Sequence, residues 1–368
     1  MYIVYCSDNP VFMNDSLQDK SWSSKFPGTG WITCLYEIAK KNNIKVASAD
    51  VALKAIEQKK WEVSDIYLVD EMYSTIGCQL LNLGCKPFAI VCGESSLYAA
   101  DFYDNIEKYS KHFFVRLGFG FKSISKIDLC EPFRFPSYYL EDLEIVGSWS
   151  DRKKLVFIAS NKYLSNKFFL ASPFKLLNFL RQLKTQFKNI SSFSFREALE
   201  CSLLDKRLEA MAYFLGQSSI EIYGSNWNDL SNLPTAWSKR SATNLNKAYL
   251  GLCDNKIKTL SKYKFNICFE NIAQDYYVTE KIIDCFVAGT IPIYLGAPNI
   301  REIIPHEAFI DLRAFKTMDD LDAYLNAMTE SLAIDMINAG RVYLNSKKGR
   351  LHSYKQFAEN IIEVANQC

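Results

Sequence analysis

KFNICFENIAQDYYVTEKIIDCFVAGTIPIYLGAPN, residues 264–299, is the stretch that decides the fold of this chain. The short, apolar and aromatic segment 265–269 predicts a buried strand, and 291–295 predicts a second one. Thr279 is a favourable N-cap residue and Gly289 a natural stop, so a helix is expected between them. Such a strand–loop–helix–strand unit puts the N-terminus of the helix at the carboxyl edge of a parallel sheet. Nucleotide phosphates commonly bind at that edge.

The same alternation of strands and helices continues on both sides of this stretch. Before it, strands are expected at 2–6, 44–47, 66–69, 87–92 and 155–160, with helical segments between them. Because 368 residues are enough for two domains of ordinary size, we place the boundary in the charged segment 142–154. The prediction is an α/β fold with an N-terminal domain over 1–148 and a C-terminal domain over 149–368.

The second half contains segments of contrasting character. A helix and a strand are expected at 205–216 and 220–223, whereas the polar stretch 227–244 is expected to be a loop. The final helix, 356–365, is expected to pack back on the pair of domains. Lys175–Lys188 covers a basic amphipathic helix, which indicates either a solvated face or a contact with a membrane surface.

Composition excludes several classes of function. A net charge of +2 gives no reason to expect nucleic acid as a partner. Eleven cysteines without a CxxC pair, and only three histidines, argue against a zinc site and against a disulfide framework. The N-terminus is too short and too polar for a signal peptide, and no apolar run reaches the length of a membrane span. We therefore expect a cytoplasmic protein without a transmembrane segment, with peripheral contact at the inner face of the membrane as an option.

The stretch at 264–299 resembles the signature of the α1,3/4-fucosyltransferases, most closely the bacterial branch. The matching positions are Phe265, the run 269–271 (FEN), the run 277–281 (YVTEK) and the run 289–293 (GTIPI). The resemblance is clear over about 205–310, is thinner over 85–140, and is not visible in the first 80 residues. It implies a GT-B-like fold, in which two Rossmann-type α/β domains face a cleft.

The resemblance also implies a reaction. Such enzymes invert configuration while they move L-fucose from GDP-β-L-fucose to a glycan hydroxyl, here O3 of N-acetylglucosamine or a similar group. The acceptor would belong to a glycoprotein, a surface polysaccharide or a lipopolysaccharide precursor. An oxocarbenium-like transition state would leave growing negative charge on the departing diphosphate.

Four residues of the second domain, and Lys281 in particular, are candidates for the donor site. Lys281 would place an ammonium group in the first turn of the predicted helix, beside free backbone N–H groups, where it can stabilise the diphosphate. By resemblance, Glu280 would accept hydrogen bonds from the ribose hydroxyls, and Asn271 and Tyr277 would contact the nucleotide.

A second cation is expected from the helix at 205–216. The family places a phosphate-binding arginine there, which corresponds to Arg207, although Lys206 is adjacent and the register is open by one residue. A planar guanidinium can bind two phosphate oxygens at once.

The general base is expected from the first domain. Inversion requires a base on the face opposite the diphosphate, and in the family it is a glutamate after a short strand and a glycine. Glu94, which follows Gly93 and the strand 87–92, matches that setting. The segment 134–140, RFPSYYL, resembles a further family pattern. Residues 95–97 (SSL) depart from the family pattern, and this departure concerns the acceptor side.

Two other functions stay open for this sequence, and no metal site is expected. The chain could use another GDP-sugar, or it could bind a nucleotide sugar without catalysing transfer. Asp319–Asp320 and the pair Asp101 and Asp104 are assigned to helix surfaces, so no DxD-type acidic pair stands in the donor region. We expect no required cofactor and no dedicated metal site, because side-chain cations would serve the diphosphate.

Overall fold

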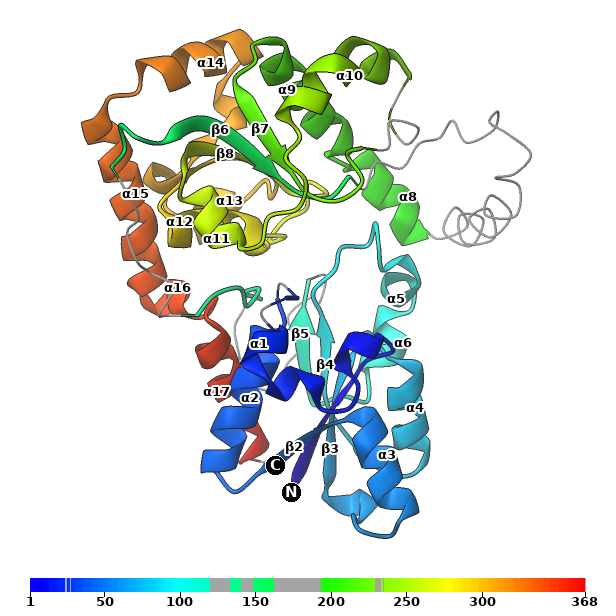
Figure 1. The fold of residues 1–368 in the computed structure, drawn as a ribbon. Coiled ribbons are helices and arrows are strands. Elements are labelled where there is room, and N and C mark those ends of the chain that lie inside the picture. The colour runs from blue at the N-terminus through cyan, green and yellow to red at the C-terminus, as the bar shows by residue number, and fades with distance from the viewer. Residues whose placement is uncertain are drawn as a thin grey trace. The chain divides into compact units, whose positions relative to one another are not determined.

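The chain divides into two compact α/β units in a computed structural model (Figure 1). The structure describes residues 1–23, 25–26, 28–119, 133–139, 148–161, 193–228, 233 and 235–367. The first unit comprises Met1–Asp142 together with Ser346–Cys368, and the second comprises Leu143–Asn345. The basic segment Lys175–Lys188 lies outside the described residues, so a membrane contact there stays a prediction.

The first unit is built on a parallel sheet of five strands, in the order β2-β1-β3-β4-β5. Four of these strands were expected from their apolar patterns, and the observed bounds agree within a few residues. The strands are β1 Tyr2–Cys6, β2 Lys45–Ser48, β3 Ile66–Glu71, β4 Lys86–Cys92 and β5 Val115–Gly118. The helices are α1 Lys20–Ser23, α2 Gly30–Lys41, α3 Ala49–Glu57, α4 Thr75–Asn82, α5 Ala100–Asp104, α6 Ile106–Ser110, α16 Lys347–Arg350 and α17 Tyr354–Ala365.

The second unit has a parallel five-stranded sheet of its own, in the order β10-β9-β8-β6-β7. The strands are β6 Lys153–Ile158, β7 Ile220–Tyr223, β8 Tyr263–Phe269, β9 Ile291–Leu295 and β10 Ile310–Asp311. The helices are α8 Phe193–Glu200, α9 Leu204–Gly216, α10 Thr235–Ala248, α11 Lys256–Leu260, α12 Glu280–Ala288, α13 Ile300–Ile303, α14 Met318–Ala327 and α15 Glu330–Asn345. The predicted α/β class with parallel sheets is thus confirmed.

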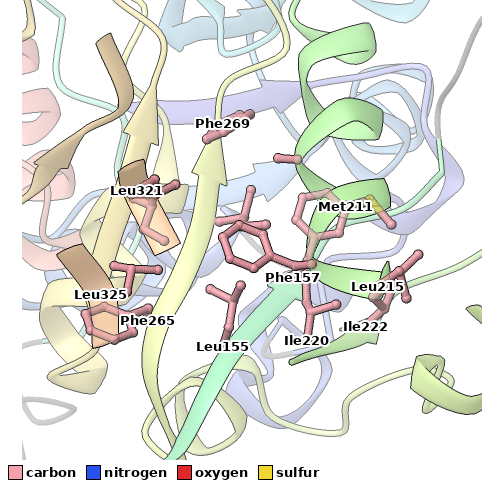
Figure 2. Packing of buried hydrophobic residues seen from close by; sticks show 14 of the residues in the cluster. Leu155, Phe157, Met211, Leu215, Ile220, Ile222, Phe265, Phe269, Leu321 and Leu325 are labelled. Atoms are coloured by element: carbon pink, nitrogen blue, oxygen red, sulfur yellow. The ribbon is translucent and has the colours of Figure 1, made fainter. Parts of the chain in front are cut away.

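The core of the second unit lies between its sheet and the helices beside it. Figure 2 shows side chains of β6, β7 and β8 meeting those of α9 and α14. Burial of this apolar surface is the main contribution that holds these elements in place. The labelled members of the cluster are Leu155, Phe157, Met211, Leu215, Ile220, Ile222, Phe265, Phe269, Leu321 and Leu325.

The domain assignment made from sequence differs from the structure at the C-terminus. We placed all of 149–368 in the second domain, but α17, red in Figure 1, packs against α2 of the first unit. Phe357 and Ile361 of α17 share a buried cluster with Trp31 of α2. An amphipathic pattern predicts a helix and its apolar face, but it does not say which distant surface covers that face.

The polar stretch at 227–244 also differs from its prediction, since residues 235–248 form α10 instead of a loop. Ser241 and Leu245 are buried, and the indole Nε1 of Trp237 donates to the carbonyl of Leu208 in α9 at 2.8 Å. Part of the contact face is therefore a narrow stripe spaced by four residues. A stripe this narrow leaves the composition of the stretch polar.

Candidate functional site

The unit formed by β8 and α12 has the local geometry that its sequence predicts. Gly289 adopts a left-handed conformation with φ of 66° directly after α12, which favours glycine. Thr279 occupies the N-cap position, but its side chain does not cap the helix. Its hydroxyl instead lies 2.8 Å and 3.1 Å from the two carboxylate oxygens of Glu270. Glu270 therefore organises this helix start.

Glu270 is the first residue after β8 and its side chain is fully buried. The backbone N–H of Thr279 donates to its Oε1 at 2.8 Å, and Lys281 Nζ lies 3.1 Å from its Oε2. A buried carboxylate needs such partners, because an unpaired charge in the interior is strongly unfavourable. Our sequence analysis did not select Glu270 as a site residue. Its place directly after a buried strand, inside the recognised motif, was the available signal.

Lys281 stands at the centre of this network. Its Nζ lies 2.8 Å from the hydroxyl of Thr279 and 3.5 Å from Glu280 Oε1, and its side chain is 16% exposed. Burial alone would lower the pKa of Lys281, but the charges of Glu270 and Glu280 raise it above its ordinary value. Lys281 is therefore a charged ammonium group, held by anions and still reachable from solvent.

Glu280 is the most exposed carboxylate of the cluster, with 25% of its side chain accessible. Burial would raise its pKa, yet Lys281 and Lys256 together lower the pKa to about 2. Lys256 on α11 is itself paired with the buried Asp284 of α12, at 2.6 Å between Nζ and Oδ2. Glu280 is thus ionised at neutral pH and can accept hydrogen bonds from hydroxyl groups.

Arg207 approaches the same place from α9. Its side chain is buried, with 5% exposed, and its Nη2 donates to Phe269 O at 2.6 Å and to Asn271 Oδ1 at 2.8 Å. Lys206 points elsewhere and pairs with Glu209 on the surface at 2.7 Å. Arg207, and not Lys206, therefore reaches the carboxyl end of β8.

Asn271 and Tyr277 join this cluster as buried residues. The Asn271 side-chain amide donates to the hydroxyl of Tyr277 at 3.4 Å, a long hydrogen bond. Both side chains are buried, so their observed role is to support Arg207, and a direct contact with a nucleotide stays a prediction. The structure thus gathers all the predicted donor-site residues around the end of β8: Arg207, Asn271, Tyr277, Glu280 and Lys281.

Glu94 belongs to the first unit and follows β4, as predicted. The hydroxyl of Tyr103 donates to the carbonyl oxygen of Glu94 at 2.8 Å, which holds the backbone at this turn, while the Glu94 side chain is exposed. A pocket of about 340 Å³ opens beside it. Among the described residues that line this pocket are Glu71, Glu94, Phe12, Trp31, Phe135 and Phe357, all from the first unit.

Comparison with protein families finds a match within the second unit. Residues 200–334 match the model of glycosyltransferase family 10 (fucosyltransferase), C-terminal domain. Alpha-(1,3)-fucosyltransferase FucT of Helicobacter pylori is 36% identical over 106 residues, which make up 28% of this chain and 22% of that protein. The matched part is therefore about a fifth of that relative's length.

Comparison with solved structures supports the fold. A crystal structure of an alpha1,3-fucosyltransferase covers all of this chain and 90% of its own, with 17% identity and a TM-score of 0.51. Anabaena HepE, solved with UDP and glucose, covers all of this chain and 99% of its own, with 9% identity and a TM-score of 0.54. At these identities the likeness shows the fold, and it agrees with the predicted GT-B-like architecture. Within the part of the chain that the structure describes, we find no helix with the length and apolarity of a bilayer span.

Proposed function

We propose that this chain transfers L-fucose from GDP-β-L-fucose to a glycan hydroxyl. The proposal starts from the match of residues 200–334 to the model of the C-terminal domain of glycosyltransferase family 10 (fucosyltransferase). The observation that carries the proposal is the network at the carboxyl end of β8. There the buried Glu270 holds the ammonium group of Lys281 at the start of α12, and Arg207 approaches from α9. A helix N-terminus with two cations is suited to a diphosphate.

Each residue has a role in an inverting displacement. The bond between the acceptor oxygen and C1 of fucose forms while the bond from C1 to the diphosphate oxygen breaks, and Glu94 takes the acceptor's proton. Lys281 and Arg207 stabilise the negative charge that grows on GDP in the transition state. Stabilisation of this kind by preorganised groups contributes on the order of several kcal/mol. Glu280, ionised at neutral pH, accepts hydrogen bonds from the ribose hydroxyls.

Acceptor, location and metal dependence are part of the same proposal. The acceptor position is O3 of N-acetylglucosamine or a similar hydroxyl. The nine described cysteines are all free thiols, which supports a reducing cytoplasmic location. Because two side-chain cations serve the diphosphate, we expect a chelator to leave transfer unchanged, and a strict requirement for a divalent ion would contradict this assignment.

The test is GDP release from GDP-fucose in the presence of candidate acceptors, with two variants compared. We expect Lys281→Ala to abolish transfer and to weaken GDP binding, because it removes charge from the donor site. Glu94→Ala should abolish transfer while GDP binding stays as in the wild type. An equal loss of GDP affinity in both variants would refute Glu94 as the base.

The same assay separates the two alternatives. Acceptor-dependent release with a GDP-sugar other than GDP-fucose would identify a related transferase. Binding of GDP-sugars with no acceptor-dependent release of any kind would identify an inactive nucleotide-sugar-binding protein.

A further inference from the structure

We infer that the pocket of the first unit selects an uncharged saccharide ring, and that Glu71 is the residue that enforces this selection. The inference rests on the proposed function in one respect, namely that this pocket receives the glycan acceptor. Nothing in the sequence motif pointed to Glu71, which is the last residue of β3.

The strand register places Glu71 and Glu94 at the same edge of the sheet. β3 and β4 are parallel neighbours in which Glu71 pairs with Val91, and Glu94 follows Val91 by three residues. Both glutamates line the 340 Å³ pocket. Burial raises the pKa of Glu71, and the negative charge of Glu94 raises this pKa further.

Glu71 is held in place from β1 and from the turn after it. The hydroxyl of Ser7 donates to Glu71 Oε2 at 2.5 Å, and the nearby hydroxyl of Tyr5 also lowers the pKa of this carboxylate. A carboxylate fixed in this way presents its remaining acceptor capacity in one direction. Such fixed acceptors are suited to hydroxyl groups on a ring, because each hydroxyl can donate one hydrogen bond.

The walls and the charge of the pocket define the class of ligand. Phe12, Trp31 and Phe135 give aromatic walls against which the apolar face of a sugar ring can pack. Among its described lining residues there are two carboxylates and no lysine, arginine or histidine. An anionic sugar would bring a third negative charge beside these two, and like charges in such a site are strongly unfavourable. A hydroxyl-rich ring without charge meets no such repulsion.

The experiment compares two ligands that differ at one carbon, where one carries a hydroxymethyl group and the other a carboxylate. Methyl β-glucoside and methyl β-glucuronide share one ring and differ only at C6, so the ratio of their affinities, measured by ligand-observed NMR, reports charge selection. We expect the full chain to favour the glucoside by about tenfold. Glu71→Gln keeps the shape of the side chain and should reduce that preference to about threefold or less. Glu57→Gln, at an exposed position that ends α3, makes the same change in net charge and should keep the wild-type ratio.

A second variant tests the inference even if Glu71→Gln fails to fold. Ser7→Ala removes the hydrogen bond to Glu71 but leaves both carboxylates, so it should weaken glucoside binding while the preference for the uncharged ring persists. Equal binding of the two ligands by the wild type, an unchanged ratio in Glu71→Gln, or no binding of either ligand would overturn the inference.

Failure of the inference can be told apart from failure of the proposed function. Charge-selective binding without any fucose transfer would contradict the proposed function and leave the selection intact. Transfer to neutral and anionic acceptors at equal efficiency would contradict the selection and leave the fucosyltransferase activity intact.

Discussion

Glu270 shows how one buried side chain can position a neighbouring cation at the start of a helix. It is a fully buried carboxylate whose oxygens are bound by Thr279 and Lys281. A buried pair of this kind adds little net stability, but removal of one partner leaves the other as an uncompensated charge. Lys281 is therefore held in position in the ligand-free protein, and under the proposed function it exchanges part of its contact with Glu270 for phosphate oxygens.

We expect Glu270→Gln to lower the free energy of unfolding of the ligand-free protein by about 3 kcal/mol, because Lys281 loses its main anionic partner. GDP should then raise the melting temperature more in this variant than in the wild type, since the diphosphate supplies the missing negative charge. Thermal melting with and without GDP measures both effects.

Glu209→Gln is the matched control for that substitution, because it breaks an exposed pair with Lys206 by the same chemical change. It should alter stability by less than about 1 kcal/mol. If Glu270→Gln behaves like this control and its response to GDP matches that of the wild type, Glu270 does not position Lys281.

At the scale of elements, the parts predicted best are those whose signals are local. The bounds of β8 and the stop of α12 follow from a short apolar run and from Gly289. The helix α10 was missed because the residues that contact the rest of the unit, among them Trp237, Ser241 and Leu245, lie in a stretch whose composition is largely polar. The pairing of Lys281 with Glu270 was missed for a related reason, since it joins residues 11 positions apart through a loop.

α10 matters for the site because it packs on α9, which carries Arg207. Leu245 is fully buried, so Leu245→Ala should lower the free energy of unfolding by about 2–5 kcal/mol through lost burial and a cavity. It should also weaken GDP binding, because α9, which carries Arg207, loses part of its support. Denaturant unfolding and a GDP titration measure the two effects. Asn246→Ala, at the exposed neighbouring position, should change neither, and an equally small effect of Leu245→Ala would argue against packing of α10 on α9.

At the scale of the whole molecule, the second unit is an insertion between two parts of the first. Residues 346–368 return to the first unit, where Ser137 N donates to His352 O at 2.8 Å and Tyr354 N donates to Tyr138 O at 2.9 Å. The sequence showed two domains and an amphipathic final helix, but not this return, which depends on contacts across more than 200 residues. Both ends of the chain are thus needed to complete the unit that contains Glu94 and its pocket.

His352 is expected to make the packing of residues 346–368 on the first unit sensitive to pH. Its ring is buried and its Nδ1 lies 3.0 Å from Phe135 O, and burial lowers the pKa of His352 to about 3. The unfolded chain binds a proton at this residue below about pH 6.5, whereas the folded chain does not until about pH 3. Its contribution to stability is therefore intact above pH 6.5 and is lost as the pH falls toward 3.

At pH 5 this single group should lower the free energy of unfolding of the first unit by about 2 kcal/mol relative to pH 7. His352→Asn keeps an N–H donor for Phe135 O but cannot be protonated, so its stability should fall less over the same interval. Denaturant unfolding of both proteins at pH 7 and pH 5 tests this expectation. His306→Asn, at an exposed histidine of the second unit, should follow the wild type. Parallel losses in the wild type and in His352→Asn would show that the return of the C-terminus does not depend on a neutral His352.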